Sequence, residues 1–129
     1  MDSEGLSCVL KNDKIIHKST ECGVKPLLKL LDSGVDYTDF SAADKICGKA
    51  AAFIYILLRV KEVYSPVMSF GAVDVFGKYG VDFYFDSLAD YIQGKTGGIC
   101  PIEHSVLEAD TPSMALELIK NKILKPREA

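Results

Sequence analysis

The stretch TDFSAADKICGKAAAFIYILLRVKEVYSPVM, residues 38–68, decides the fold. Residues 38–45 have the small and extended character of a strand, and residues 61–68 are typical of another short strand. Between them, residues 48–60 are apolar on nearly every side, which predicts a helix that is buried on most of its surface. A strand, a buried helix and a second strand in this order favour a layered α/β protein.

The segments on either side extend the same alternation. Asn12-Asp13 is a two-residue turn between two β-type runs, which predicts a hairpin at the start of the chain. The order β-β-α-β-α-β-α-β then predicts a three-layer α/β/α sandwich whose sheet is covered by helices. The expected strands are 6–11, 14–18, 38–45, 61–68 and 81–85; the expected helices are 24–34, 48–60, 69–78, 87–93, a short helix that opens at Cys100-Pro101, and an amphipathic helix at about 111–125.

Length and composition limit the classes of function. We expect one domain over residues 1–129, because this length suits a single core. The formal net charge is −3 and the cations are scattered, which argues against a nucleic-acid partner. The longest apolar run, residues 50–58, is far shorter than the ~20 residues of a membrane span, so we expect a cytoplasmic protein without a membrane partner. The four cysteines lack CxxC spacing, which excludes a zinc ribbon or thioredoxin motif.

The first candidate site follows the strand at 38–45. Asp44, Lys45, Gly48 and Lys49 lie within six residues, where a strand passes into a helix. Ligands of open α/β sheets bind at the carboxyl ends of strands, and free amides at a helix start favour an anion. Lys45, Gly48 and Lys49 are therefore candidate binding residues for a phosphate or carboxylate, and Asp44 is a candidate acid or base. A tight turn with charges at its rim explains the same residues without a ligand.

The second candidate site is GKTGGICPIEHS, residues 94–105. Glycine-rich loops before a helix often bind ligands, so Gly98 is a candidate binding residue. Cys100 precedes a helix start, which favours the thiolate, and Glu103 follows on the same turn. Both are candidate catalytic residues. The alternative is a buried apolar Cys100 and a Glu103 that only faces the helix dipole.

Three stretches, AADKICGKAAA, VKEVYSPV and GGICPIE, resemble an uncharacterised bacterial family within the cytidine deaminase-like superfamily. The resemblance covers residues 6–108. It implies a cytidine deaminase-like α/β/α sandwich with a mixed sheet. It also implies a homo-oligomer, because proteins of this superfamily are commonly dimers or larger.

The zinc chemistry of that superfamily is not expected here. Its deaminases carry H-x-E or C-x-E at one helix start and P-C-x-x-C at the next. This chain has Cys47-Gly48-Lys49 at the first position, so a lysine replaces the glutamate. At the second position, residues 66–70 read PVMSF, without either cysteine. One cysteine cannot hold a catalytic zinc, which needs three protein ligands. We therefore expect no metal and no cofactor.

Three functions remain open after this exclusion. The chain can be a metal-independent enzyme in which Cys100 acts on a small anionic molecule held by Asp44, Lys45 and Lys49. It can be a binding or regulatory module that kept the pocket without catalysis. It can also be an oligomeric interaction module. The residues favour binding of a small anionic metabolite, nucleotide-like or with a phosphate or carboxylate, with catalysis left open.

Overall fold

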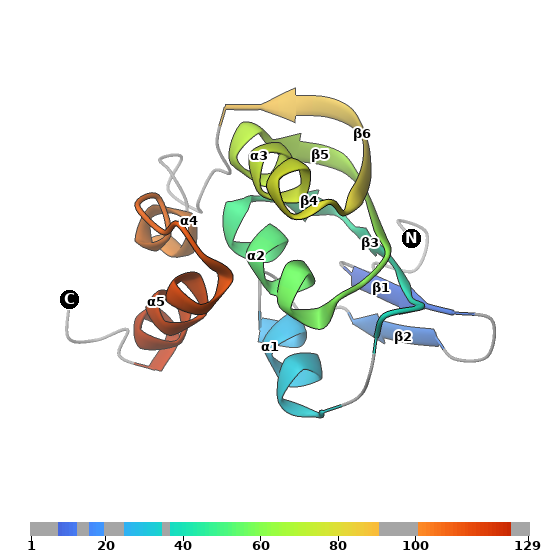
Figure 1. The fold of residues 1–129 in the computed structure, drawn as a ribbon, viewed down its shortest axis with the longest axis horizontal. Coiled ribbons are helices and arrows are strands. Elements are labelled where there is room, and N and C mark those ends of the chain that lie inside the picture. Colours follow the sequence, from blue (N-terminus) through green and yellow to red (C-terminus); the bar gives the residue numbers. More distant parts are fainter. Residues whose placement is uncertain (1–7, 13–15, 20–24, 35–36, 91–100, 125–129) are drawn as a thin grey trace.

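The computed structural model describes residues 8–12, 16–19, 25–34, 37–90 and 101–124 (Figure 1). The strands are β1 Cys8–Lys11, β2 Ile16–Ser19, β3 Ser41–Asp44, β4 Ile46–Cys47, β5 Glu62–Ser69 and β6 Asp82–Ala89. The helices are α1 Lys25–Asp32, α2 Lys49–Leu58, α3 Phe70–Tyr79, α4 Pro101–Ser105 and α5 Pro112–Leu124. The predicted alternation of strands and helices is confirmed. The predicted two-residue hairpin turn at Asn12-Asp13 is wrong: Lys11 pairs with Ile16, so the four residues 12–15 join β1 to β2, and β2 begins at Ile16 rather than at residue 14.

The strands form one mixed sheet, in which β5 lies between β6 on one side and β3 and β4 on the other. Strand β1 is antiparallel to β2 and to β3, whereas β3, β4 and β6 are parallel to β5. Ala43 pairs with Tyr64 and Ile46 with Val67, so β3 and β4 keep one register against β5. Strand β4 therefore continues β3 after an interruption at Lys45. The α/β class and the mixed sheet are as the sequence predicts.

Helix α2 lies at the centre of the fold, and α1, α2 and α3 cover one face of the sheet (Figure 1). Residues 50–55 of α2 are all buried, because the helix packs against α1, α3 and α5. A surface helix has a polar face toward water. Helix α2 has none, because neighbouring elements cover it on nearly every side. The predicted burial of residues 48–60 is confirmed for most of that segment.

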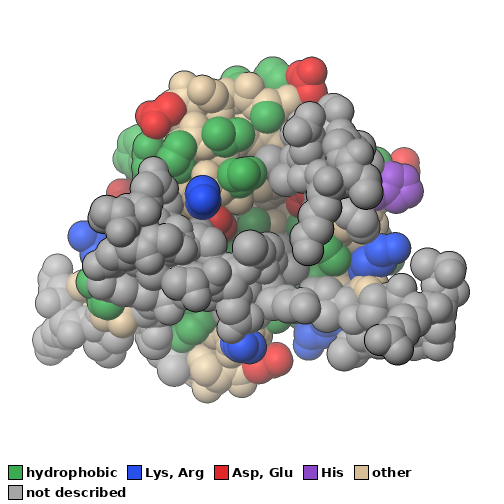
Figure 2. Space-filling view, turned by 180° about the vertical axis from the view of Figure 1, so that it is seen from behind, with side chains coloured by type: hydrophobic (Ala, Val, Ile, Leu, Met, Phe, Trp, Pro, Cys, Tyr) green, Lys and Arg blue, Asp and Glu red, His purple; other side chains and the backbone are tan. Residues whose placement is uncertain are grey.

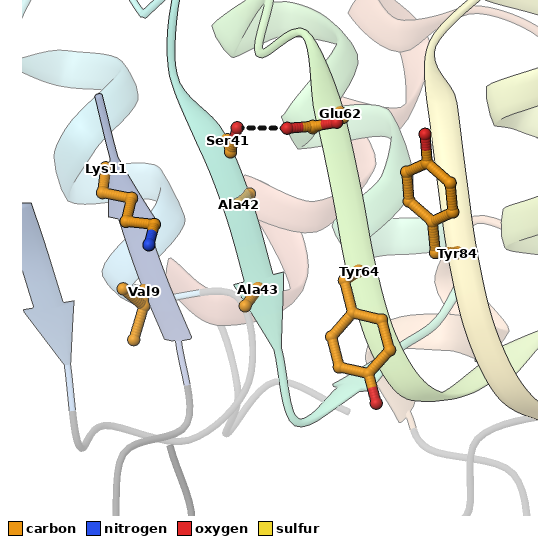
Figure 3. A pocket seen from close by; sticks show the side chains of 8 residues that line it. All are labelled: Val9, Lys11, Ser41, Ala42, Ala43, Glu62, Tyr64 and Tyr84. Carbon is orange, nitrogen blue, oxygen red and sulfur yellow. Dashed lines mark hydrogen bonds between the residues drawn. The ribbon is translucent and has the colours of Figure 1, made fainter. Parts of the chain in front are cut away.

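The opposite face of the sheet has no helix among the described residues. Figure 3 looks onto this face and shows the strands in front of the helices. Side chains that point to the helices, such as Leu10 and Val63, are fully buried, whereas Tyr64 and Tyr84 on the other face are exposed. The described part is thus a sheet with helices on one side, and the third layer of the predicted sandwich is not seen in it.

One predicted helix is wrong. Residues 87–89 belong to β6, which pairs with β5 as far as Ser69 and Ala89, so the expected helix at 87–93 does not begin there. The sequence pattern is short and ambiguous at this point, and the ladder to β5 decides the conformation. Residues 91–93 lie outside the described part.

The last helix begins as predicted. The Thr111 hydroxyl accepts a hydrogen bond from the Met114 amide at 3.2 Å, which caps α5. None of the helices in the described ranges has the length and apolar character that crossing a membrane requires.

Candidate functional site

The start of α2 is held by a carboxylate from another helix. The side chain of Glu103, on α4, accepts hydrogen bonds from the Lys49 amide at 2.7 Å and from the Ala50 amide at 2.8 Å. Gly48 precedes the helix and has no side chain that could cap it. Glu103, which is 54 residues away from Lys49 in the sequence, therefore caps the helix in place of the Ser or Asp that usually precedes a helix.

This contact fills the position that the sequence predicts for an anion. The first amides of a helix carry partial positive charge and favour a negative group. Here that group is the chain's own carboxylate, which is only 8% exposed. Burial raises the pKa of Glu103, while the two amides and the charge of Lys49 act to lower it. An external anion would have to displace Glu103 to reach these amides.

Lys49 faces outward from the same turn. Its ammonium group donates to the Leu107 carbonyl at 2.9 Å and lies 5.8 Å from the centre of the Phe53 ring. Gly71 of α3 packs so closely that a Cβ there would lie 3.1 Å from the Lys49 Cβ. Lys49 also lines a small cleft of about 160 Å³ between α2 and α3, together with Lys78 and Asp74. The side chain thus ties the α4–α5 connection to the body of the fold.

Asp44 lies beneath α2 and makes a separate set of contacts. It accepts a hydrogen bond from the Tyr55 hydroxyl at 2.8 Å, and the backbone of Lys45 and Ile46 also bonds to it. Burial raises the pKa of Asp44 to about 7, and the three hydrogen bonds act to lower it. Its carboxyl is therefore a buried group that can exchange a proton near neutral pH.

The predicted site residues divide into three groups. Gly48, Lys49 and Glu103 come together at the start of α2, whereas Asp44 is buried with Tyr55 and Lys45 is exposed. Gly98 and Cys100 lie outside the described residues. The contact between Glu103 and α2 was not predicted. Its only signal in the sequence is a helix start without a capping side chain, which requires an acceptor from elsewhere.

A larger cavity lies on the face of the sheet that no described helix covers (Figure 3). We call it the sheet groove; the sequence does not indicate it. Its volume is about 360 Å³. It is lined by Val9, Lys11, Ser41, Ala42, Ala43, Glu62, Tyr64 and Tyr84. Figure 2 views the molecule from this side and shows hydrophobic side chains gathered over the region of β5 and β6.

Strand register arranges the groove in two rows. Lys11, Ser41 and Glu62 pair in sequence across β1, β3 and β5, and form a polar row. The Ser41 hydroxyl donates to one oxygen of Glu62. The next row on this face places Val9 and Ala43 beside the two tyrosines, because Ala43 pairs with Tyr64 and Tyr64 with Tyr84.

The small Ala43 leaves a depression between larger neighbours on both sides. The Tyr64 hydroxyl donates to Asp86 at 2.7 Å, which fixes its ring, whereas Tyr84 is 53% exposed. A ligand in the sheet groove would meet aromatic surface, one carboxylate and one ammonium group.

Helices on one face of a mixed sheet and a groove on the other define this chain as an α/β protein with a ligand-sized cavity. The family model of a domain of unknown function, DUF1893, matches residues 1–123, and the chain belongs to this family. It is similar to the crystal structure of a DUF1893 family protein from Thermotoga maritima, with 29% identity and a TM-score of 0.84. The match covers 96% of this chain and 83% of the other. No curated protein gives a significant match.

Replacing Glu103 tests its role at the start of α2. We expect Glu103→Ala to lower the free energy of unfolding by about 1–2 kcal/mol, because two amides lose their acceptor. Glu103→Gln should cost less, since one amide oxygen remains. Denaturant unfolding measures both. Glu108→Ala is the control, because that side chain is exposed on the adjoining segment. Equal stability of the Glu103→Ala and Glu108→Ala variants would contradict the capping role.

Asp44 should make stability depend on pH. Its pKa rises from 3.8 to about 7 on folding, so the native state keeps a proton that the unfolded state has released. The stabilisation is complete below about pH 4 and is lost as the pH rises to about 7. Unfolding of the wild type and of Asp44→Asn across this range should show their stability difference falling with rising pH, by roughly 4 kcal/mol at most. A difference that does not change with pH would show that the carboxyl titrates normally.

Proposed function

We propose that this protein binds a small anionic metabolite of the nucleotide type in the sheet groove. The observation that carries the proposal is the pairing of an aromatic row with a polar row in one cavity. A volume of about 360 Å³ falls within the range of small-molecule sites, which are mostly apolar with a few placed polar groups. The start of α2, where the sequence places the anion, is a weaker candidate because Glu103 already holds its amides.

The aromatic row suits a planar ring. Tyr84 offers an exposed ring, and Tyr64 is held in place beside it by Asp86. A heterocycle lying over Ala43 would pack against these rings without a clash, because alanine projects only a methyl group. Stacking of a base on an aromatic side chain is favourable for any base, since every base has a flat π face. The row therefore supports a nucleobase-like ring and selects weakly among bases.

The polar row suits the two ends of such a ligand. Ser41 donates to one oxygen of Glu62, and the carboxylate can accept hydrogen bonds from ring N–H groups with the other. Lys11 lies two strands from Glu62, roughly 10 Å across the sheet. Within the described residues, no carboxylate lies within ion-pair distance of its ammonium group. A ring near Glu62 can thus place a phosphate or carboxylate substituent beside Lys11.

We further infer that the fold belongs to the cytidine deaminase-like superfamily and has lost zinc chemistry. The positions that carry zinc motifs in deaminases are brought together here, because Cys47 pairs with Met68 at the starts of α2 and α3. The donor set does not fit zinc, since Val67 and Phe70 stand at the two cysteine positions and Lys49 at the glutamate. Among the residues described, no three His, Cys, Asp or Glu side chains are placed to hold a metal ion.

Catalysis remains a separate proposal. The enzyme hypothesis needs Cys100 as a nucleophile, and the described residues support binding without naming a reaction. Asp44 is buried with Tyr55 and does not line the sheet groove, so we do not assign it to this ligand.

Ligand binding is tested with a nucleoside monophosphate, the matching nucleoside and inorganic phosphate as probes. We expect the nucleotide to raise the melting temperature most, because it engages both rows and binds only the native state. Calorimetry should show Tyr84→Ala weakening binding of the nucleotide roughly 5- to 150-fold through lost stacking. Lys11→Ala should weaken binding of the nucleotide and leave that of the nucleoside unchanged.

Tyr79→Ala and Lys61→Ala are matched controls, because both side chains are exposed and lie outside the groove. If none of the three probes stabilises the protein, or if Tyr84→Ala and Tyr79→Ala bind alike, the proposed site is wrong.

The loss of zinc chemistry has its own test. We expect the purified protein, incubated with zinc and then dialysed, to retain no stoichiometric metal by elemental analysis. It should also deaminate neither cytidine nor adenosine. One tightly bound zinc per chain, together with deamination that a chelator abolishes, would refute the proposal.

A further inference from the structure

Strand β6 ends the sheet and leaves one edge open. It is eight residues long, pairs with β5 along its inner edge, and has no partner on its outer edge within the described part of the chain (Figure 1). Most of its residues are exposed. The outer edge therefore presents backbone N–H and C=O groups that can pair with another strand.

The side chains of β6 are more apolar than a protected edge usually allows. Phe83 and Phe85 stack on the helix side of the sheet, with ring centres 6.4 Å apart, and Phe83 stacks on Phe76 of α3. Phe85 is nevertheless 37% exposed and Leu88 is 42% exposed. Natural edge strands commonly avoid pairing through lysines, prolines or bulges, and β6 contains no lysine or proline. Its only charges are Asp82 and Asp86.

We propose that a second copy of this chain pairs with β6 along this edge. The two β6 strands would run antiparallel about a twofold axis perpendicular to the sheet, with Phe85 opposite Phe85 of the other copy. The two sheets then form one continuous sheet, and both sheet grooves lie on the same face. This inference does not depend on the proposed ligand, because Phe85 faces the helix side and not the groove.

The aspartates select this register. Opposed residues of an antiparallel pair point to the same face, so every allowed register places residues of equal parity opposite each other. A register centred on Tyr84 opposes Asp82 to Asp86, and one centred on Asp86 opposes Asp86 to itself. Like charges directly opposite are destabilising. In the register centred on Phe85, no aspartate lies opposite another aspartate. This register pairs residues 82–88 of both strands, and every other register without opposed aspartates pairs fewer residues.

The same register places complementary groups together. Tyr84 lies opposite Asp86 of the other copy, so its hydroxyl can donate to the carboxylate that already accepts from Tyr64. On the other face, the two Phe85 rings meet between the Phe83 rings and extend the stack that begins at Phe76. Aromatic cross-strand pairs of this kind stabilise antiparallel sheets. The partner favoured by these contacts is a second copy, which supplies the same strand.

Cysteine cross-linking tests the register. Directly opposed side chains bring their Cβ atoms close enough for a disulfide, so Phe85→Cys should give a covalent dimer under mild oxidation. Asp82→Cys should not, because its opposite residue is Leu88. A mixture of Asp82→Cys and Leu88→Cys should cross-link to each other. The wild type, which has native cysteines, and Phe85→Ser provide the background under the same conditions.

Light scattering after size exclusion tests the assembly itself. The wild type should have the mass of a dimer. Phe85→Lys should have the mass of a monomer, because the two introduced ammonium groups would lie opposite each other and repel. Leu107→Lys, a comparable change at a residue 51% exposed and away from β6, should remain dimeric. Circular dichroism shows that each variant is folded. A monomeric wild type, a dimeric Phe85→Lys, or efficient cross-linking of Asp82→Cys alone would each overturn the proposal.

Discussion

Burial of α2 is the constraint on which the rest of the structure depends. The helix is apolar on nearly every side, so no arrangement that leaves one face in water would be stable. The sheet covers one side, and α1, α3 and α5 cover the others. The parallel pairing of β3 and β5 follows from this arrangement, because the chain must cross over α2 between them. The order of the layers is thus a consequence of one hydrophobic segment.

A buried helix needs its polar ends satisfied. Glu103 supplies a carboxylate to the first amides of α2. Lys49 donates to the Leu107 carbonyl and so fixes the segment between α4 and α5. These two contacts join α4 to the central helix although the residues are far apart in sequence. Asp44 is a second buried carboxyl near the same helix, and Tyr55 satisfies it from within. The charged residues that suggest a binding site in the sequence therefore serve, in large part, to hold the helices together.

The uncovered side of the sheet is where the described structure offers surface for other molecules. Small residues on β3 create the sheet groove, and the exposed edge of β6 lies beside it. Tyr84 belongs to both regions, because it lines the groove and lies on the edge strand. The proposed ligand and the proposed second copy would therefore both contact Tyr84.

The sequence by itself determined the elements and their class. The apolar run at 48–60 and the strand-like runs around it predict an α/β chain with a buried central helix, because periodicity is a local property. The sequence also predicts the hairpin of β1 and β2, but not the length of its turn, which the pairing of Lys11 with Ile16 sets. The absence of zinc chemistry is an expectation from the sequence and remains a proposal. The sequence did not determine the end of β6, since residues 87–89 follow their ladder to β5 and not their own pattern.

Only the tertiary structure decided what the polar residues do. It placed Glu103 on the amides that the sequence left for a ligand, and it aligned Lys11, Ser41 and Glu62 into one row from three strands. The physical reason is that both arrangements depend on strand register and helix packing, which bring together residues that no local pattern connects.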